Sequence, residues 1–267
     1  MLSRRLGCAV CVLLCICIGL WAYKFHFRLF NLLSFYRNRR IFSFITHRTH
    51  VAVHSRFGGI PHELAGKVLV LSPIAFRPGR REELIRSVLD RISQAPSTFR
   101  THNVRVVDYL DFKSGYAFSP HVDIEWNSIT NDGYQVWHLV ANEHRHNHGN
   151  LFLVYNPYVY ERYKGTAYYL TMHDHTIHVR KNCRYNVLTH GETLETFDAD
   201  WFDQHTRVYY VDVRPGETLV FDRNLCHMTD ALRATSRYAV NFRVVYGDLD
   251  HVDNCGYINS TEVIVPS

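Results

Sequence analysis

The chain has 267 residues, of which 46% are hydrophobic and 14% aromatic, and its formal net charge is +5. This composition argues against a largely disordered chain, and the mild, scattered basic charge is not the footprint of a nucleic-acid-binding protein. The length suits one globular domain with a full hydrophobic core. The 18 histidines fall mostly in the central part of the chain, which makes a metal site a hypothesis to test.

An apolar run stands near the start of the chain. Leu6 to Tyr23 is a stretch of 18 uncharged residues with basic residues on both sides. As a helix rising ~1.5 Å per residue, it would nearly match the ~30 Å hydrocarbon core of a bilayer. We predict a transmembrane signal anchor at 6–23 behind a short tail at 1–5. A cleaved signal peptide is the alternative, but Leu20-Trp21-Ala22 is a poor cleavage site.

The orientation of this anchor depends on the charges around it. Arg4 and Arg5 favour a cytoplasmic N-terminus, whereas basic residues from Lys24 to Arg40 favour the opposite. A very short N-terminal tail usually stays cytoplasmic, and Asn259-Ser-Thr261 is a glycosylation acceptor that matters only in a lumen. We expect a single-pass membrane protein with its folded domain in the lumen of the endoplasmic reticulum or Golgi. A cytoplasmic domain is the alternative.

The stretch after the anchor has no clear period. Phe25 to His50 mixes aromatic residues and arginines, which indicates a stem or interfacial segment; an ordinary first helix of the domain is the alternative. We therefore divide the rest of the chain into a stem at 24–59, a folded domain at 60–250 and a C-terminal tail at 251–267.

The folded domain begins with two elements of different type. Lys67 to Leu71 is a short apolar run typical of a buried strand. Arg80 to Gln94 has apolar residues at helical spacing and charged residues on the other face, which predicts an amphipathic helix.

From residue 103 onward, short strands follow one another, separated by Gly, Pro, Asn and Asp. A helix followed by many short strands indicates a mainly β fold with flanking helices, its core a closed or double-sheet jelly roll. The expected strands are Val104–Leu110, Tyr116–Ile124, Tyr134–Asn142, Leu151–Val159, Ala167–Met172, Thr176–Val179, Val208–Val213, Glu217–Phe221 and Tyr238–Tyr246.

Two candidate metal ligands share one of these strands. His121 and Asp123 stand two positions apart, so a strand would present both on the same face. An imidazole beside a carboxylate makes two of the three ligands in the two-His-one-carboxylate facial triad, which leaves coordination positions open on Fe(II). The same motif occurs again as His251-Val-Asp253, so the residues downstream must decide between the two.

Only the first motif has a suitable partner later in the chain. His227 follows the predicted strand Glu217–Phe221 at the end of what we expect to be a loop, and Arg237 comes ten residues after it. The planar guanidinium of an arginine can hold a carboxylate with two hydrogen bonds, which suits a dicarboxylate cosubstrate. His251 is followed by neither a histidine nor an arginine. His121, Asp123 and His227 are therefore the predicted metal ligands.

These residues resemble the 2-oxoglutarate/Fe(II)-dependent dioxygenases, in particular the phytanoyl-CoA hydroxylase-like branch. The resemblance covers roughly residues 60 to 247. Besides the ligand motif, the similar segments are Gln135-Val-Trp137, Gly149–Val154, Arg214–Phe221 and the final strand Arg237–Arg243.

The resemblance implies a double-stranded β-helix core of the jelly-roll or cupin-like kind, with Fe(II) held by His121, Asp123 and His227 as the catalytic centre. Arg237 would pair with the distal carboxylate of 2-oxoglutarate, and Gln135 would lie near that cosubstrate. Where many members have Ser two residues after the arginine, this chain has Ala239. A second donor to the distal carboxylate must therefore come from elsewhere.

Such enzymes use O2 to convert 2-oxoglutarate into succinate and CO2 while they hydroxylate an organic substrate. A small molecule, a lipid and a protein side chain all remain open as that substrate. A catalytically inactive, membrane-tethered jelly-roll binding protein is the alternative function.

A third hypothesis is a zinc site built on His173-Asp174-His175 and His178, which has no partnered arginine. The alternating histidines of Glu143–His148 are interpreted as solvated loop residues, and Trp137 as a core aromatic residue rather than a pocket wall.

Overall fold

The structure is a computed structural model that describes most of the folded part of the chain. The described residues are 32–47, 51–54, 59–112, 118–123, 127–128, 132–142, 151–181, 191–229, 237–246, 249–250 and 262–263. The predicted anchor at 6–23, the histidine-rich loop at 143–148 and the second motif at 251–253 lie outside them. No helix among the described residues is long and apolar enough to cross a membrane.

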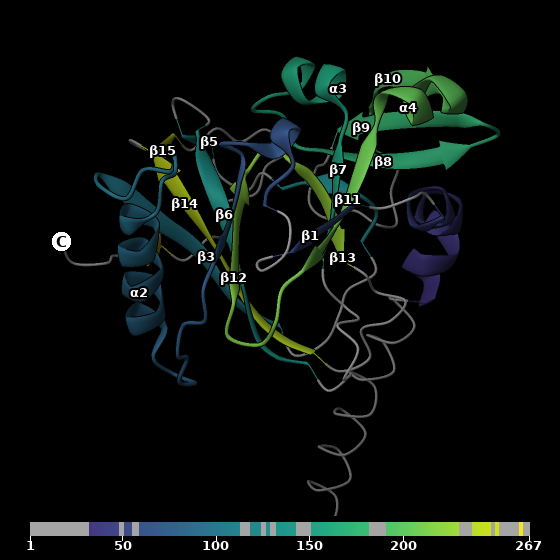
Figure 1. Ribbon diagram of the computed structural model, residues 1–267. Coiled ribbons are helices and arrows are strands. Elements are labelled where there is room, and N and C mark those ends of the chain that lie inside the picture. Colours follow the sequence, from purple (N-terminus) through teal and green to yellow (C-terminus); the bar gives the residue numbers. More distant parts are fainter. Residues whose placement is uncertain are drawn as a thin grey trace, which may run out of the picture.

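Two β-sheets pack face to face as a sandwich (Figure 1). The larger sheet has the order β1 (Val51–His54), β11 (Arg207–Asp212), β7 (Leu151–Tyr155), β13 (Cys226–Thr229), β4 (His121–Val122), β8 (Tyr168–His173), β9 (Thr176–Lys181) and β10 (Thr193–Asp198). The smaller sheet has the order β16 (Glu262–Val263), β3 (Val104–Phe112), β14 (Arg237–Tyr246), β6 (Gly133–Asn142), β12 (Thr218–Asp222) and β2 (Val68–Leu71). Neighbouring strands in both sheets are antiparallel, apart from the parallel pair β1 and β11. A short separate ladder joins β5 (Asn127–Ser128) to β15 (Leu249–Asp250).

The chain crosses repeatedly from one sheet to the other. It passes from β3 in the smaller sheet to β4 in the larger one, returns to β6 and crosses again to β7. Later it runs from β12 through β13 to β14 in the same alternating manner. This path is consistent with a jelly roll. The expected mainly β class with a few helices is confirmed.

Side chains alternate between the inside of the sandwich and its outer faces, as the two-residue period of a strand requires. Leu153, Tyr209 and Leu219 belong to the apolar cluster between the sheets. On the outer face of the smaller sheet, α2 (Arg81–Gln94) packs Leu84, Ile85, Val88 and Ile92 against Val136, Val240, Phe242 and Val244. This is the predicted amphipathic helix.

A second helix, residues 32–46, covers the outer face of the larger sheet and is the purple ribbon in Figure 1. Its Ile41, Phe42 and Ile45 are at most 3% exposed and join the apolar cluster formed by the outer face of that sheet. Of the two interpretations of Phe25–His50, these residues match an ordinary first helix of the domain.

The prediction of one strand over Leu151–Val159 is wrong at its C-terminal end. Strand β7 stops at Tyr155, and helix α3 (Pro157–Arg162) follows. The side chain of Asn156 accepts a hydrogen bond from the backbone N–H of Val159 at 3.1 Å, which caps the helix. Pro157 occupies the first helical position, where its missing N–H costs nothing.

Two elements near residue 200 were not expected. Strand β10 leads directly into helix α4 (Ala199–His205). Asp198 caps this helix by accepting hydrogen bonds from the backbone N–H groups of Asp200 and Trp201. An aspartate before a short amphipathic stretch is the sequence signal for such a start.

Candidate metal centre

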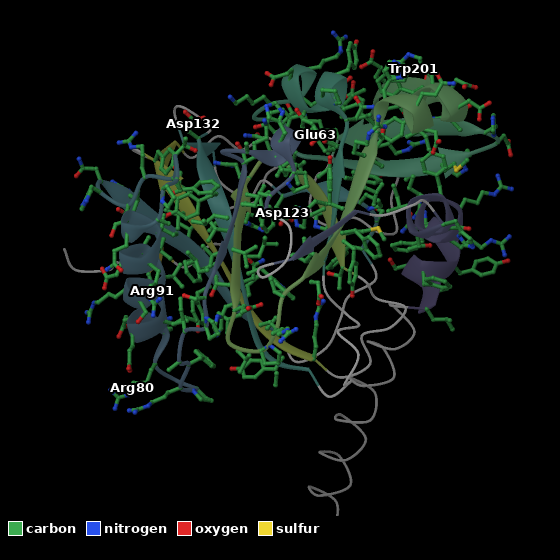
Figure 2. All side chains as sticks on the ribbon, viewed as in Figure 1. Glu63, Arg80, Arg91, Asp123, Asp132 and Trp201 are labelled. Atoms are coloured by element: carbon green, nitrogen blue, oxygen red, sulfur yellow. The ribbon has the colours of Figure 1, made fainter. Side chains whose placement is uncertain are left out.

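A cavity of about 400 Å³ lies between the two sheets. Asp123, near the centre of the molecule in Figure 2, is one of its lining residues. The polar lining consists of His121, Asp123, Gln135, His227, Thr229, Arg237, Asn241 and Arg243, and the apolar lining of Leu110, Phe118, Trp137, Leu151 and Phe221. All the site residues expected from the sequence therefore meet in one cavity. Trp137 belongs both to the core and to the cavity wall.

Two neighbouring strands place the histidines. His121 on β4 stands directly opposite His227 on β13, and the centroids of the two rings are 4.6 Å apart. The adjacent side chains of Val122, Cys226 and Met228 face the other way, into the cluster under helix 32–46. His227 is the second residue of a strand, not the end of a loop as expected. Because His227 lies within a strand, the direction of its side chain is as well defined as that of His121.

Each imidazole is oriented by a backbone carbonyl group. Nδ1 of His121 lies 2.7 Å from the carbonyl oxygen of Ser119, and Nδ1 of His227 lies 3.1 Å from that of Leu225. A ring nitrogen at this distance donates its proton to the oxygen, so Nε2 of the neutral ring carries the lone pair. Both Nε2 atoms face Asp123, at 3.3 Å from Oδ1 for His121 and at 3.4 Å from Oδ2 for His227.

The three side chains thus turn electron-rich atoms toward one another in a buried place. Their ligand atoms all lie within 4.8 Å of one another. Oδ1 of Asp123 is buried and has no hydrogen-bond partner among the described residues. Lone pairs and a carboxylate gathered in a low-dielectric interior repel one another unless a cation lies between them. The residues present fit a metal ion, which His121, Asp123 and His227 can hold together.

The ionisation of the triad follows from the same geometry. Burial alone would raise the pKa of Asp123, but the positive charge of Arg243, together with His121, holds that pKa well below its usual range. Burial acts to lower the pKa of His121, but the Asp123 carboxylate outweighs it, so the pKa of His121 is raised. Burial lowers the pKa of His227, helped by the nearby His121. Asp123 is therefore ionised over the whole physiological range, as a metal ligand must be.

Arg243 touches the triad, although it is not among the site residues expected from the sequence. Its Nη2 lies 3.1 Å from Oδ2 of Asp123, and both side chains are less than a tenth exposed. Gln135 donates a hydrogen bond from Nε2 to the same oxygen at 3.2 Å. These two donors occupy one carboxylate oxygen and leave the other for a metal ion. The even spacing between Arg237 and Arg243 indicates that both side chains leave the same face of one strand, but it does not identify Asp123 as the partner of Arg243.

Arg237 lies farther along the cavity wall than Arg243. On β14, Arg243 pairs in register with Gln135 of β6, whereas Arg237 pairs with Asn142. The Arg237 guanidinium lies 5.4 Å from the centroid of the Trp137 ring, and its Nη2 donates to Oγ1 of Thr229 at 3.4 Å. Arg237 is only 5% exposed. This part of the cavity is a buried cationic site with a hydroxyl group beside it.

Thr229 is a second cavity residue that was not expected. It lies two positions after His227 on β13, and both side chains line the cavity. Ala239, which stands where many members of the resembled family have Ser, is fully buried in the inner cluster. Thr229 therefore places a hydroxyl group beside Arg237 in the cavity. The strand period identifies it once His227 is known to lie within a strand.

The rival histidine cluster does not assemble. His173 and His178 bring their rings to 5.6 Å across the β8–β9 hairpin. His175 instead pairs with Asp200 at 3.3 Å, and Asp174 pairs with Arg40 at 3.0 Å. Within the part of the chain that the structure describes, His121, Asp123 and His227 form the one group that brings three ligand atoms together. The zinc hypothesis for residues 173–178 has no geometric support.

Comparisons with known proteins assign no family. No protein-family model matches the chain, and no curated protein matches it either.

Proposed function

We propose that this protein is an Fe(II)- and 2-oxoglutarate-dependent dioxygenase that hydroxylates an organic substrate. The observation that carries the proposal is that one buried cavity contains both the His-Asp-His triad and Arg237. Three protein ligands leave positions open on a metal ion, whereas a structural zinc site is closed by four. A double-stranded β-helix core would bring β4 and β13 together in this way, and the strand order supports it.

His121, Asp123 and His227 would hold the Fe(II). When bound, Fe(II) with 2-oxoglutarate and O2 supplies the oxidation in which a substrate C–H becomes C–OH while 2-oxoglutarate is converted into succinate and CO2. One oxygen atom of O2 enters the alcohol and the other enters succinate, so the equation balances without a further reductant. In this chain, Arg243 and Gln135 would hold Asp123 so that it offers a single oxygen atom to the iron.

Arg237 and Thr229 would bind the distal carboxylate of 2-oxoglutarate. The arginine offers paired N–H donors and the threonine an O–H donor, and both act where burial strengthens charged hydrogen bonds. The Trp137 ring beside the guanidinium would help to hold it in place through a cation–π contact. The cosubstrate would then extend from this pair toward the triad, where its other end binds the metal.

The apolar wall would keep water away from the reacting atoms. Phe221 lies 5.0 Å from the ring of His227, and Phe118 lies 5.8 Å from the ring of His121, measured between ring centroids. Aromatic walls on both sides of the ligands lower the local dielectric constant and limit unproductive reactions with water.

The direct test is an anaerobic titration of the full chain, purified in detergent, with Fe(II) and 2-oxoglutarate. We expect the weak visible charge-transfer band of a chelated iron complex, lost in His227→Ala and weakened in Arg237→Met. His178→Ala is the matched control, because it removes a histidine from a hairpin outside the cavity. A well-folded protein that takes up iron but gives neither this band nor succinate from 2-oxoglutarate is instead a catalytically inactive binding protein.

A further inference from the structure

The outward face of helix 32–46 carries three of the five large hydrophobic residues that are exposed in the described part of the chain. Leu32 is 62% exposed, Leu33 46% and Tyr36 65%, and all three lie in the first turns of this helix. The remaining large hydrophobic residues exposed in the described part of the chain are Leu110 and Tyr158, on β3 and α3. Single exposed apolar residues are ordinary, but a cluster indicates a contact surface.

Positive charge follows directly on the same helix. Residues 32–47 contain Arg37, Arg39 and Arg40 and no acidic residue. The guanidinium of Arg39 lies 4.7 Å from the ring centroid of Tyr36. Arg40 pairs with Asp174 on the surface, and such an exposed pair is worth little and is easily exchanged for another anion. The outward face therefore runs from apolar to cationic along the helix.

The helix cannot rotate this face away from solvent. Ile41 and Ile45 on its opposite side are completely buried against the outer face of the larger sheet, with Phe42 beside them. Asn38 donates a hydrogen bond to the carbonyl group of Ser34, and both residues are buried. The exposure of Leu32, Leu33 and Tyr36 is thus imposed by the packing of the rest of the helix.

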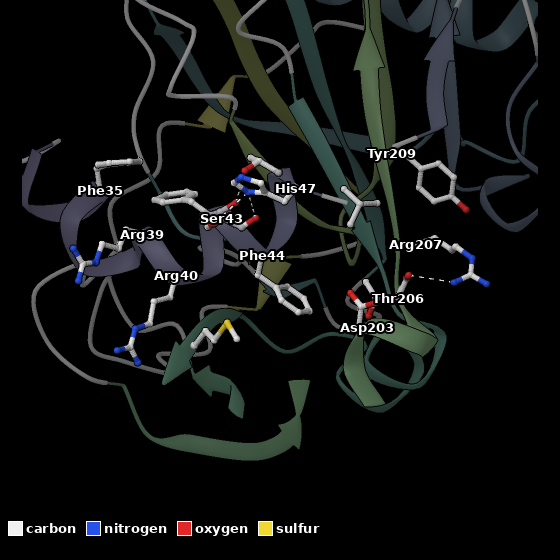
Figure 3. Close-up of a pocket in the computed structure, with 14 residues that line it drawn as sticks. Phe35, Arg39, Arg40, Ser43, Phe44, His47, Asp203, Thr206, Arg207 and Tyr209 are labelled. Atoms are coloured by element: carbon white, nitrogen blue, oxygen red, sulfur yellow. Dashed lines mark hydrogen bonds between the residues drawn. The ribbon is translucent and has the colours of Figure 1, made fainter. Parts of the chain in front are cut away.

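A groove of about 1330 Å³ runs beside the helix (Figure 3). Phe44 points from the helix toward Thr206, the residue before β11, while Arg39 and Arg40 extend from the part of the helix farther left in Figure 3. The apolar lining is Phe35, Phe42, Phe44, Met172 and Val208. Apolar walls next to arginines match the boundary between acyl chains and anionic headgroups in a membrane.

The position of the helix in the chain also favours a membrane surface as its partner. Eight residues, 24–31, separate it from the uncharged run at 6–23. Fully extended, these eight residues span at most ~29 Å. A helix tied this closely to the expected anchor would stay near the bilayer surface.

We propose that the exposed face of helix 32–46 docks on the anionic surface of the membrane in which residues 6–23 would anchor the chain. Because anionic lipids are concentrated in the cytoplasmic leaflet, this docking requires the cytoplasmic orientation of the folded domain, the alternative to the lumenal one. Leu32, Leu33 and Tyr36 enter the headgroup region, and the arginines pair with lipid phosphates. Because this helix covers the outer face of the larger sheet, that face is held next to the bilayer. The smaller sheet and α2, on the opposite side of the sandwich in Figure 1, then point away from it.

Oxidative footprinting of the full chain in lipid nanodiscs tests this orientation. Discs of phosphatidylcholine, with or without phosphatidylserine, are exposed to hydroxyl radicals, and oxidation of Tyr36 and Tyr158 is measured by mass spectrometry. We expect phosphatidylserine to slow the oxidation of Tyr36 several-fold and to leave Tyr158 unchanged. Replacing Arg37, Arg39 and Arg40 together by Gln should abolish this dependence on phosphatidylserine.

The matched control replaces Arg77, Arg80 and Arg81, exposed residues before and at the start of α2, by Gln. It removes the same charge on the far side of the sandwich and should leave the protection of Tyr36 intact. Equal oxidation of Tyr36 in both kinds of disc, or loss of protection in the control variant, overturns the proposal. Protection of Tyr36 that appears in detergent and grows with protein concentration assigns the face to a second copy of the chain instead. A chain that is not retained in the discs and does not sediment with phosphatidylserine vesicles also overturns it.

Discussion

The two faces of strand β14 differ in chemistry although they are made from the same ten residues. Toward the cavity the strand presents Arg237, Asn241 and Arg243; toward α2 it presents Val240, Phe242 and Val244, none of which is exposed. The inner face holds charges that burial makes costly, and the outer face supplies apolar burial that stabilises the fold. Substitutions on the two faces should therefore separate loss of the site from loss of stability.

The largest effect is expected from Asp123→Asn on the inner side. The amide keeps the volume of the carboxylate but removes the negative charge between two imidazoles and leaves Arg243 without its anion. We expect metal content to fall to background and succinate formation to stop, as measured by metal analysis and 2-oxoglutarate turnover. Asp174→Asn, at an exposed position 95% accessible to solvent, is the control and should change neither. Stoichiometric iron in Asp123→Asn would falsify the assignment of the triad.

The outer face should give the opposite result. Phe242→Ala removes a fully buried ring between β14 and α2 and should lower the free energy of unfolding by about 3–5 kcal/mol. Denaturant unfolding measures the loss. Protein that remains folded should bind as much metal as the wild type, because the side chain points away from the cavity. If the folded fraction of this variant loses its metal, then the two faces are not independent.

On the inner face, the two arginines should have different roles, one in 2-oxoglutarate binding and the other in metal binding. Arg237→Met removes the charge that would meet the distal carboxylate, so we expect 2-oxoglutarate affinity to fall by about 2–4 kcal/mol, or roughly 30- to 1000-fold. Metal affinity in the absence of 2-oxoglutarate should stay unchanged. Arg243→Met should instead lower the metal affinity measured without 2-oxoglutarate, because Arg243 contacts the metal ligand Asp123. Both constants come from metal titrations with and without 2-oxoglutarate.

The sequence predicts the triad better than it predicts the neighbours of the triad. His121 and Asp123 were brought together by the two-residue period of the expected strand Tyr116–Ile124, and His227 with Arg237 by their order and spacing. Of that expected strand the described residues form only β4 at His121–Val122, and Asp123 directly follows it. The contact between Arg243 and Asp123 could not be derived in this way, because it depends on which strands become neighbours. The register of β14 also shifts twice along this stretch, between Tyr238 and Ala239 and between Asn241 and Arg243.

Fold prediction failed where polar residues decide an element boundary. Asn156 and Pro157 end β7 and begin α3, and Asp198 begins α4, in stretches where apolar patterning alone suggested a continuous strand or no element. Strand β13 is four residues long, too short for a period to be recognised without knowing its neighbours. Apolar periodicity identified α2 and the long strands because burial against a whole sheet fixes many residues at once.

A histidine on the outer side of β6, which faces α2, should make the stability of the fold depend on pH. His138 is fully buried, lies 2.9 Å from Thr218 through its Nδ1, and has its pKa lowered by burial to about 4. The unfolded chain, with a histidine pKa near 6.5, binds a proton between these two values while the folded chain does not. Stability should therefore fall with decreasing pH through this window, by about 2 kcal/mol at about pH 5. His138→Gln should remove this component, as the difference between the unfolding free energies of the two proteins at each pH will show. Equal pH dependence in the two proteins contradicts the prediction.

The smallest effect is expected from Thr229→Val. Valine keeps the shape of threonine but cannot donate a hydrogen bond to a carboxylate, so we expect 2-oxoglutarate to bind about fivefold more weakly, a cost of about 1 kcal/mol. Metal affinity and stability should not change. Thr171→Val is the matched control, because Thr171 is also a strand residue whose hydroxyl group accepts a hydrogen bond from an arginine, Arg180, but it lies outside the cavity. If both variants bind 2-oxoglutarate as the wild type does, Thr229 is not the second donor. Asn241, whose buried Oδ1 has no hydrogen-bond partner among the described residues, then becomes the next cavity residue to replace.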